Sequence, residues 1–395
     1  MTNLRLSLGL CCLFCVVVLA SSSHQDSPPP PNPRLQNACK AFQAWKDVIS
    51  SDPKNFTSNW NSQDVCKYNG VYCAPSPDDP NITTVAGIDL NHADIVGSLP
   101  EELGLLIDLA LFHISSNHFH GVIPESFGNL HLLYEFDVSN NQFTGPFPSI
   151  VLYLTSLKYL DIRFNEFQGD VPSRLFDLKL DAIFINNNKF QFSLPKNIGN
   201  TSASVLVLAN NNLCGFVPSS LARLGRNVNE INLMNCGIRG RLPLEIGWLK
   251  NLTVFDVSFN RLVGSLPKTI VYMRSLELLN VANNKFSGDI PASICSLPKL
   301  QNFTYSFNFF HGESQSCLKI PDNDNKNNCI PGQPLQRSLP ECKWFLSHPV
   351  VCNRFRCSPK KAPTWYLHLP FHRYITIIKH HFHKLTSPPT HHHYP

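Results

Sequence analysis

Residues 249–267 read LKNLTVFDVSFNRLVGSLP, and this stretch decides the fold because close copies of it recur along the chain. One copy, at residues 130–145, reads LHLLYEFDVSNNQFTG. Both place leucine, phenylalanine and valine at the same offsets before an asparagine, and both place a glycine four residues after it. Such self-similarity indicates a chain built from one repeated structural unit.

The repeat period is 23 to 25 residues, measured between the glycines that end each Asn-x-apolar-x-Gly element. A period of about 20 to 29 residues identifies the leucine-rich-repeat architecture. The Gly-x-apolar-Pro element that follows, as in Gly264 to Pro267, is typical of the plant-type repeat. We therefore predict an α/β leucine-rich-repeat solenoid over residues 85–320, with about ten repeats and a parallel concave β-sheet. The ten marker positions are Gly97, Gly121, Gly145, Gly169, Phe192, Gly215, Gly240, Gly264, Gly288 and Gly312.

Asparagine stands four residues before the marker in eight of the ten repeats, and Ala93 and Cys236 occupy this place in the other two. A sharp turn after each strand leaves backbone groups unpaired, and a buried amide side chain can bond them. We therefore expect these asparagines to have a structural task. Ala93 lies in the first repeat, where a cap covers one side and a departure from the pattern is expected.

A solenoid needs caps at its two open ends, and cysteines mark both. Residues 39–84 form the expected N-terminal cap, which begins with a helix-like stretch. Its layout resembles the N-terminal cap of plant extracellular repeats, which implies a Cys66–Cys73 bridge. Cys295 and Cys317 flank the final turn and are predicted to pair. Residues 321–357 contain further cysteines and are predicted to form a small disulfide-tied hinge.

The first residues resemble an export signal, since Arg5 precedes an apolar run that ends in small residues. We assign residues 1–23 to a signal peptide and 24–38 to a Pro-rich segment. An uncleaved N-terminal anchor is the alternative. No later stretch approaches the roughly 20 apolar residues of a membrane helix, so a secreted chain without a membrane span is expected.

Fourteen cysteines leave eleven once the signal peptide is removed, an odd number. One thiol therefore stays free or makes an intermolecular bridge, as in a disulfide-linked homodimer. Export would also make five Asn-x-Ser/Thr sequons usable for glycosylation. They are Asn55, Asn81, Asn200, Asn251 and Asn302.

The net charge of +5 lies entirely in residues 358–395, which contain five lysines and arginines and no acid. A neutral body with a short basic tail lacks the charge footprint of a nucleic-acid-binding protein. The tail is rich in histidine, which would suit metal binding. A disordered linker or an altered gene end is the interpretation we favour, with no metal or cofactor.

Specific strings of this chain resemble the leucine-rich repeat extensins, plant wall proteins with an N-terminal repeat domain and a C-terminal extensin domain. They include KDVISSDPKNFTSNW at residues 46–60, VAGIDLNHADIVGSLPEELGLLIDL at 85–109 and IPASICSLPKLQNFTYSFNFFHG at 290–312. LDAIFINNN at 180–188 and TVFDVSFN at 253–260 belong to the same set. The resemblance runs from about residue 34 to residue 357.

This resemblance implies attachment to the cell wall through Ser-Pro repeats and a repeat domain that binds small basic secreted peptides, the rapid alkalinization factors. Wall polysaccharides or wall proteins are further expected partners. The extensin domain is missing after residue 357, where only Ser387-Pro388-Pro389 is similar to it. Family members often have a cysteine pair at the positions of Phe216 and Arg241, so we expect no bridge between the out-of-step Cys214 and Cys236.

The predicted concave face has one outward position at the centre of each strand, because side chains alternate across a strand. Four of the ten residues are aspartate and none is lysine or arginine, which suits a basic peptide with Phe184 and Val207 as an apolar centre. Aspartate at this place also has local structural reasons in plant repeats, which is the alternative. The predicted contact residues are Asp89, His113, Glu135, Asp137, Asp161, Arg163, Phe184, Glu230 and Asp256.

No enzyme is predicted. The sequence contains no nucleophile elbow, phosphate loop, His-Glu-x-x-His or kinase signature. Asp89 and His113 lie one repeat apart but on an open surface, where nothing would shift their pKa values. The alternatives to a peptide-binding wall protein are a purely structural wall constituent and an inhibitor of polygalacturonase.

Overall fold

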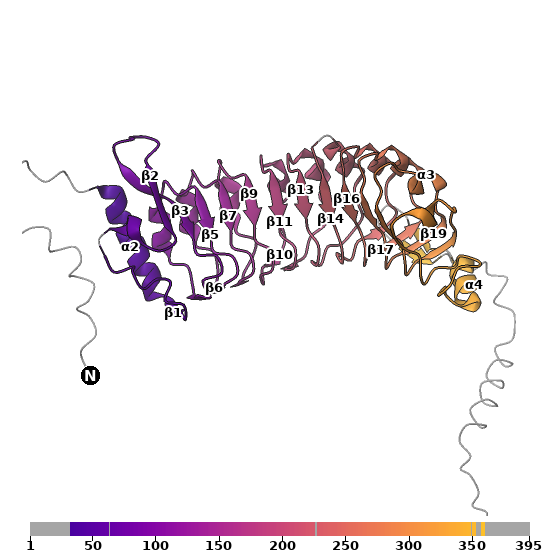
Figure 1. Ribbon diagram of the computed structural model, residues 1–395, viewed down its shortest axis with the longest axis horizontal. Helices are drawn as coiled ribbons and strands as arrows, with labels where there is room; N and C mark the ends of the chain where they lie inside the picture. Colours follow the sequence, from indigo (N-terminus) through magenta and orange to yellow (C-terminus); the bar gives the residue numbers. More distant parts are fainter. Residues whose placement is uncertain (1–31, 63, 226, 349, 353–356, 360–395) are drawn as a thin grey trace, which may run out of the picture.

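The computed structural model describes residues 32–359 except 63, 226, 349 and 353–356. Within these residues the chain forms one curved solenoid, whose strands stack side by side between two caps (Figure 1). The predicted signal peptide, the Pro-rich residues before Asn32 and the basic tail from residue 360 lie outside the described residues.

One sheet of 12 strands runs along the solenoid. It begins with β2 (Val71–Pro75), which pairs antiparallel with β3 (Thr83–Asp89), and every later neighbouring pair is parallel. The predicted repeat fold with its parallel sheet is therefore confirmed. The remaining strands are β5 (Leu111–His113), β7 (Glu135–Asp137), β9 (Tyr159–Asp161), β11 (Ala182–Phe184), β13 (Val205–Val207), β14 (Glu230–Asn232), β16 (Val254–Asp256), β18 (Leu278–Asn280), β20 (Asn302–Thr304) and β22 (Asp322–Asp324).

The opposite edge of the solenoid is a row of short helices, one for each repeat. Each begins directly after the proline of the Gly-x-apolar-Pro element, because proline holds the preceding residue extended and cannot continue a strand ladder. They are the 3₁₀ helices η2 (Glu101–Leu105), η3 (Glu125–Asn129), η4 (Ser149–Tyr153), η5 (Ser173–Asp177), η6 (Lys196–Asn200), η7 (Ser219–Leu224), η8 (Leu244–Trp248) and η9 (Lys268–Tyr272), and the short helix α3 (Ala292–Cys295).

Short strands after the strand-end turns, together with β1 of the N-terminal cap, form smaller ladders between the main sheet and the helices. They are β1 (Ile49–Ser51), β4 (Val96–Gly97), β6 (His118–Gly121), β8 (Gln142–Phe143), β10 (Gln168–Gly169), β12 (Lys189–Phe190), β15 (Arg239–Gly240), β17 (Arg261–Gly264), β19 (Lys285–Asp289) and β21 (Phe309–Gly312).

The predicted asparagines form a buried ladder that joins consecutive repeats. The Asn141 Oδ1 accepts a hydrogen bond from the Phe119 backbone N–H of the preceding repeat at 2.9 Å. Its Nδ2 donates to the Ile114 carbonyl of that repeat at 2.9 Å and to the Val138 carbonyl of its own turn at 3.2 Å. The pattern recurs in later repeats, for example at Asn165, Asn260 and Asn284.

Cys236 replaces asparagine with only part of these contacts. Its thiol donates to the Leu208 and Met234 carbonyls at 3.4 and 3.5 Å. Asn260 compensates on the C-terminal side, where its Oδ1 accepts from the backbone N–H groups of Cys236 and Ile238.

The repeats continue beyond residue 320, the boundary that we expected. Strand β22 pairs in parallel with β20, and Asn328 takes the next place in the ladder, where its Oδ1 accepts from the Phe310 N–H at 3.1 Å. The interval from Asn308 to Asn328 is 20 residues, shorter than the 23 to 25 of the other repeats. This shortening hides the eleventh turn from a search at constant period.

The core is one continuous column of apolar side chains, in which phenylalanine stacks on phenylalanine. Phe143, Phe167 and Phe190 lie one repeat apart with ring centroids 6.3 and 6.2 Å from each other. Phe286 and Phe310 repeat this stacking near the C-terminal end. Identical positions in neighbouring repeats thus bury each other, which no single repeat could do alone.

The N-terminal cap contains α2 (Pro33–Asp47) and the short η1 (Val65–Lys67). Helix α2 begins before residue 39, the expected boundary, because the Asn32 side chain caps it and Pro33 suits the first helical position. Phe42, Trp45 and Trp60 are fully buried and close the end of the core. The predicted Cys66–Cys73 bridge is present.

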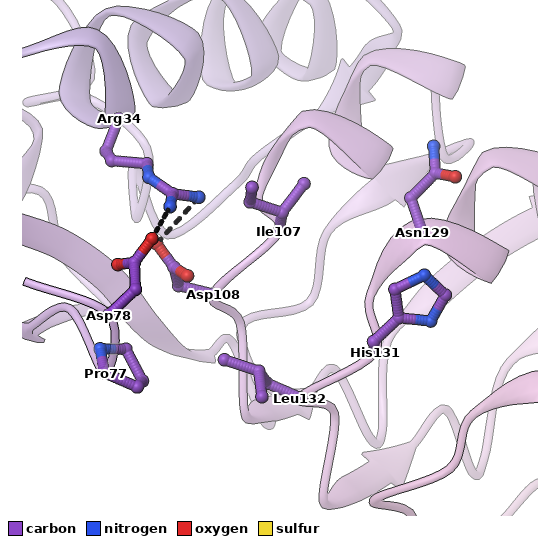
Figure 2. A pocket seen from close by; sticks show the side chains of 8 residues that line it. All are labelled: Arg34, Pro77, Asp78, Ile107, Asp108, Asn129, His131 and Leu132. Carbon is purple, nitrogen blue, oxygen red and sulfur yellow. Dashed lines mark hydrogen bonds and ion pairs between the residues drawn. The ribbon is translucent and has the colours of Figure 1, made fainter.

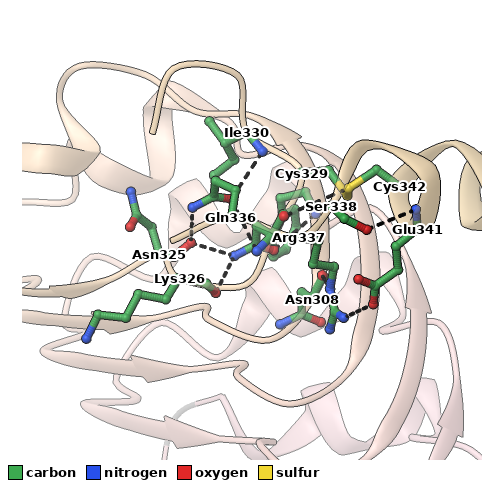
Figure 3. The surroundings of a disulfide bond; sticks show 12 residues. Asn308, Asn325, Lys326, Cys329, Ile330, Gln336, Arg337, Ser338, Glu341 and Cys342 are labelled. Carbon is green, nitrogen blue, oxygen red and sulfur yellow. Dashed lines mark hydrogen bonds and ion pairs between the residues drawn. A yellow bond between two sulfur atoms is a disulfide. The ribbon is translucent and has the colours of Figure 1, made fainter. Parts of the chain in front are cut away.

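The C-terminal cap holds the predicted Cys295–Cys317 bridge and a second bridge, Cys329–Cys342. The second bridge ties the last turn, with η10 (Cys317–Lys319) nearby, to α4 (Leu339–Ser347), as Figure 3 shows. Arg337 reaches from α4's start to the Asn308 carbonyl at 2.8 Å and also bonds Glu341. Strands β23 (Val350–Cys352) and β24 (Cys357–Pro359) form a final hairpin.

Replacing Asn141 by alanine is expected to destabilise the protein by about 3 kcal/mol, because the substitution leaves buried backbone donors and acceptors of two repeats without partners. The measurement is urea unfolding followed by circular dichroism with the disulfides intact.

Gln142→Ala is the matched control for this substitution, since Gln142 is the exposed neighbour of Asn141. It is expected to change stability by less than about 0.5 kcal/mol. Equal stability of Asn141→Ala and Gln142→Ala would contradict a structural role for the ladder.

Candidate functional site

The central residues of the strands form one column in register on the concave face. The strand pairing joins Asp89 to His113, His113 to Asp137, Asp137 to Asp161 and Asp161 to Phe184. The column continues through Val207, Asn232, Asp256, Asn280 and Thr304 and ends at Asp324. The structure therefore brings the predicted residues of this column into register on one face of the sheet, whereas their function as contact residues stays a prediction.

Most carboxylates of this column have a local structural task. One oxygen of Asp89, Asp137 and Asp256 accepts a hydrogen bond from the backbone N–H two residues later, at 3.0, 2.9 and 2.8 Å. Asn232 and Asn280 make the same bond through their amide oxygens. The position thus favours a short side chain with an acceptor oxygen, as aspartate and asparagine have, although His113, Phe184 and Val207 show that the fold does not require one.

The remaining acceptor capacity differs along the column. In the described part of the chain the second oxygens of Asp89 and Asp137 have no partner, and neither has the Glu230 carboxylate of the neighbouring row. Asp256 is more occupied, because the Asn280 amide donates to its other oxygen at 3.0 Å. The Glu135 carboxylate lies 3.0 Å from the His113 Nε2. Asp89, Asp137 and Glu230 are therefore the best placed acids for a ligand.

Asp161 is not a surface residue, and the expectation that its side chain faces solvent is wrong. It is fully buried, with 0% of its surface exposed. The Tyr159 hydroxyl donates to its Oδ2 at 3.3 Å, and the Arg163 Nε lies 3.1 Å from the same oxygen. Both covering residues lie two positions away on the same face, so their longer side chains close over the carboxylate.

An aromatic group adjoins this buried acid. The Arg163 guanidinium lies 5.1 Å from the Phe184 ring centroid, and the Tyr159 and Phe184 centroids are 5.6 Å apart. Arg163 is thus held between a carboxylate and a ring. Val207 is 92% buried, with 8% of its surface exposed, so the expected apolar centre consists of Tyr159 and Phe184 instead.

Both Asp161 and Tyr159 have raised pKa values. Burial raises the pKa of the Asp161 carboxyl to about 7, and the nearby Asp137 charge adds to this effect, while Arg163 opposes it. Burial also raises the pKa of the Tyr159 phenol. The cause is the loss of water around both groups, which disfavours their charged forms.

A separate hollow of about 580 Å³ lies beside the N-terminal cap, on the helix edge and away from the column (Figure 2). One side of its polar wall is an ion-pair group, in which Arg34 lies 2.7 Å from Asp78 and 3.3 Å from Asp108, and Asn129 and His131 line the other side. A hydrogen bond from Ser76 and the charge of Arg34 hold the pKa of Asp78 below its ordinary value. This group ties α2 to the first repeat.

The predicted modification sites are accessible in four of five cases, since Asn55, Asn81, Asn200 and Asn251 are exposed. Asn302 is half-buried in β20 on the concave face. Their glycosylation stays a prediction. Among the cysteines, Cys214 is an exposed free thiol and Cys236 a buried one, and they are not bridged to each other.

Two absences hold for the described residues only. None of their helices is long and apolar enough to cross a membrane. Among those residues no group of three or more His, Cys, Asp or Glu side chains is placed to hold a metal ion. The histidine-rich tail lies outside this part of the chain.

Two residues of structural weight were missed by the sequence reasoning. Tyr159 shields Asp161, and its position two residues upstream on the same strand face is a signal that could have revealed this. Asn328 continues the ladder, and the sequence Asn327-Asn328 before an apolar residue could have been recognised had a shorter repeat been allowed.

We predict that Asp161→Asn removes a pH-dependent loss of stability. The unfolded carboxyl has a pKa near 3.8, so between about pH 4 and about pH 7 the folded chain binds more protons here than the unfolded chain. The stability linked to protonated Asp161 is thus present at acidic pH and is lost as the pH rises through 7. Urea unfolding at about pH 5 and about pH 8 should show a loss on the order of 2 kcal/mol larger for the natural chain than for the variant.

Asp256→Asn is the matched control, because Asp256 has the same backbone bond but is half-exposed. It should keep the pH dependence of the natural chain. Parallel pH profiles for the natural chain and Asp161→Asn would show that Asp161 has no raised pKa.

The chain matches two family models, the leucine rich repeat N-terminal domain over residues 36–74 and the leucine rich repeat over residues 108–130 and 275–297. The repeat folds of solved plant receptors are similar to it. The HAESA ectodomain of Arabidopsis in complex with an extended IDA peptide hormone is 27% identical with a TM-score of 0.64, over 77% of this chain and 50% of that one. A plant peptide hormone receptor in complex with RGF2 is 25% identical with a TM-score of 0.57, over 62% of this chain and 40% of that one.

Curated relatives from Arabidopsis thaliana are far more similar. Leucine-rich repeat extensin-like protein 6 is 69% identical over 83% of this chain and 70% of its own length. Leucine-rich repeat extensin-like protein 2 is 60% identical over 84% of this chain but only 43% of its own length. Neither these relatives nor the matched models are named as enzymes. The chain belongs to the leucine-rich repeat extensin-like family.

Proposed function

We propose that this chain is an extracellular cell-wall protein whose concave face binds a small basic secreted peptide of the rapid alkalinization factor type. The observation that carries the proposal is a set of carboxylates on the concave face that have acceptor oxygens without a partner in the described part of the chain. Asp89 and Asp137 of the column keep one such oxygen each, and Glu230 of the neighbouring row keeps two. These acids lie on a single open face. A peptide rich in lysine and arginine would meet them at the same time.

Charge along the column supports a cationic ligand. Carboxylates recur from β3 to β22, whereas Arg163 is the cation near the centre and is already held by Asp161 and Phe184. Complementary charge accelerates encounter and excludes acidic competitors, while contributing modestly to affinity at an exposed surface. The acids would therefore select the ligand.

The aromatic group would supply the affinity. Tyr159 and Phe184 lie at the middle of the concave face, with Arg163 over the ring of Phe184. Energetically dominant contacts tend to be central aromatic and arginine side chains ringed by polar ones. A hydrophobic residue of the peptide would pack on Tyr159 and Phe184, while lysine or arginine side chains of the same peptide would pair with Asp137 and Glu230.

Similar folds support a peptide as the ligand class. The HAESA ectodomain and the RGF2 receptor are solved with peptide hormones, and both are repeat solenoids like this chain. Wall organisation and growth are proposed as the process, through the extensin-like relatives. This chain spans 70% and 43% of the two relatives compared, so activities of their whole length are carried over only as part of the proposal.

Replacing Asp89 and Asp137 by asparagine and Glu230 by glutamine is expected to weaken binding of a folded rapid alkalinization factor peptide about tenfold, since each exposed charge pair contributes up to about 1 kcal/mol. Asparagine keeps the backbone hydrogen bond of the column. Titration calorimetry at low and high salt measures the effect, and the salt dependence should shrink in the variant.

The control variant removes the same number of charges from exposed sites away from the sheet, with Glu102→Gln, Glu125→Gln and Asp170→Asn. It should bind the peptide like the natural chain. If the two variants bind equally well, the concave column is not the peptide site.

A further inference from the structure

A second surface on the helix edge has features that the proposed peptide site does not use. Trp248 ends η8 and Tyr272 ends η9, at the same position of consecutive repeats. Their side chains are 60% and 57% exposed, and Leu244 at the start of η8 is 65% exposed. Exposed large apolar side chains grouped in this way mark interaction sites more often than single ones do.

The two helices are locked together, so the aromatic residues keep a fixed relation. A Cβ at Gly247 would lie 2.1 Å from the Thr269 carbonyl oxygen, so only glycine permits this close approach of η8 and η9. The Thr269 hydroxyl donates to the Leu244 carbonyl across the same contact. A rigid platform loses little entropy when it binds a ligand.

Five exposed cations lie on the same edge, in the repeats of the aromatic pair and the two repeats beside them. Arg223 is on η7 and Lys268 on η9, while Lys250, Arg274 and Lys299 follow η8, η9 and α3. Within the described residues none of the five makes an ion pair, and Glu245 is the carboxylate located in η8. Cations without a partner next to open rings fit an anionic ligand with flat faces.

Tyr153 occupies the equivalent position in an earlier repeat, but its ring is covered by a cation. Tyr153 ends η4 as Trp248 ends η8, and it is similarly exposed at 58%. Its ring is covered by Arg174, whose guanidinium lies 5.4 Å from the centroid. Among the described residues, no cation or ring covers Trp248 or Tyr272. The charge of the edge also differs, since Glu101, Glu102 and Glu125 make its N-terminal part acidic.

We propose that Trp248, Tyr272 and these five cations, the basic aromatic strip, bind a polymer of uronic acids. Pyranose rings pack their C–H faces on aromatic rings, and their carboxylates would meet a cation from each neighbouring repeat. A sugar polymer fits better than a nucleic acid. The three disulfides indicate an oxidising compartment outside the cytosol, and the strip has too few cations for a phosphate backbone.

The test is titration of enzymatically deglycosylated protein with a purified oligogalacturonate, because a glycan on the adjacent Asn251 would cover the strip. Trp248→Ala with Tyr272→Ala is expected to weaken binding about tenfold, and Trp248→Phe with Tyr272→Phe to restore most of it. Lys268→Gln with Arg274→Gln should weaken binding similarly and reduce its salt dependence. Peptide binding on the concave face should be unchanged in all these variants.

Matched controls occupy the same repeat positions elsewhere on the edge. Tyr153→Ala and the pair Lys179→Gln with Lys196→Gln should leave oligogalacturonate binding unchanged. Equal losses in control and strip variants would overturn the proposal. So would equal affinity for a neutral glucan oligosaccharide or for single-stranded DNA, since either would show that the strip does not recognise a carboxylated sugar.

Discussion

The rest of the structure depends on the buried asparagine at the end of each strand. The chain must turn sharply there to begin the return path, and the turn leaves backbone groups unpaired inside the protein. One amide side chain supplies an acceptor and two donors, and it bonds its own turn and the preceding repeat together. The residue thus solves a local problem and a stacking problem at once. Because this solution recurs in all but two of the ten repeats, where Ala93 and Cys236 replace the asparagine, the strands come into register and the apolar positions of neighbouring repeats fall on one another.

Registration of the strands turns single positions into columns. The position at the strand centre needs an acceptor oxygen for the backbone two residues later, so aspartate and asparagine recur there for the fold. A charged column is therefore in part a by-product of folding. What distinguishes a ligand site is the capacity left after this bond, which is large at Asp137 and small at Asp256, where Asn280 uses the second oxygen. Counting aspartates along the column overstates the surface charge offered to a ligand.

The fold could be predicted from sequence because its signal is repeated ten times at fixed offsets. The Cys66–Cys73 bridge was implied by the resemblance to plant N-terminal caps, and the Cys295–Cys317 bridge followed from two cysteines that flank the final turn. The prediction was wrong where neighbouring side chains changed the exposure of a residue, and incomplete where the spacing between repeats changed. The alternation of side chains along β9 correctly placed Asp161 on the concave face. Its burial depends on the long side chains of Tyr159 and Arg163, which cover it, and the alternation pattern gives no information on side-chain length. Asn328 was missed because the last turn is shortened. The start of α2 was missed because Asn32 and Pro33 form a capping pair inside a stretch rich in proline.

Positions free of any folding task are the ones where binding chemistry is easiest to recognise. The last residue of some edge helices is such a place, since Asn129, Tyr153, Trp248 and Tyr272 occupy it and are exposed. At the ends of other edge helices the residue has a folding task, because Leu224 and Cys295 are buried and Asn200 donates a hydrogen bond to Asp177. No common side chain is required there, so neither the repeat nor the core explains an exposed tryptophan. On the concave face the reverse holds, because an aspartate satisfies the backbone whether or not a ligand exists. The two proposed surfaces therefore differ in how far the fold alone accounts for their residues. A ligand on the concave column is indicated only by the carboxylate oxygens that the backbone leaves unbonded, whereas on the strip the exposed aromatic side chains and the unpaired cations both lack a role in folding.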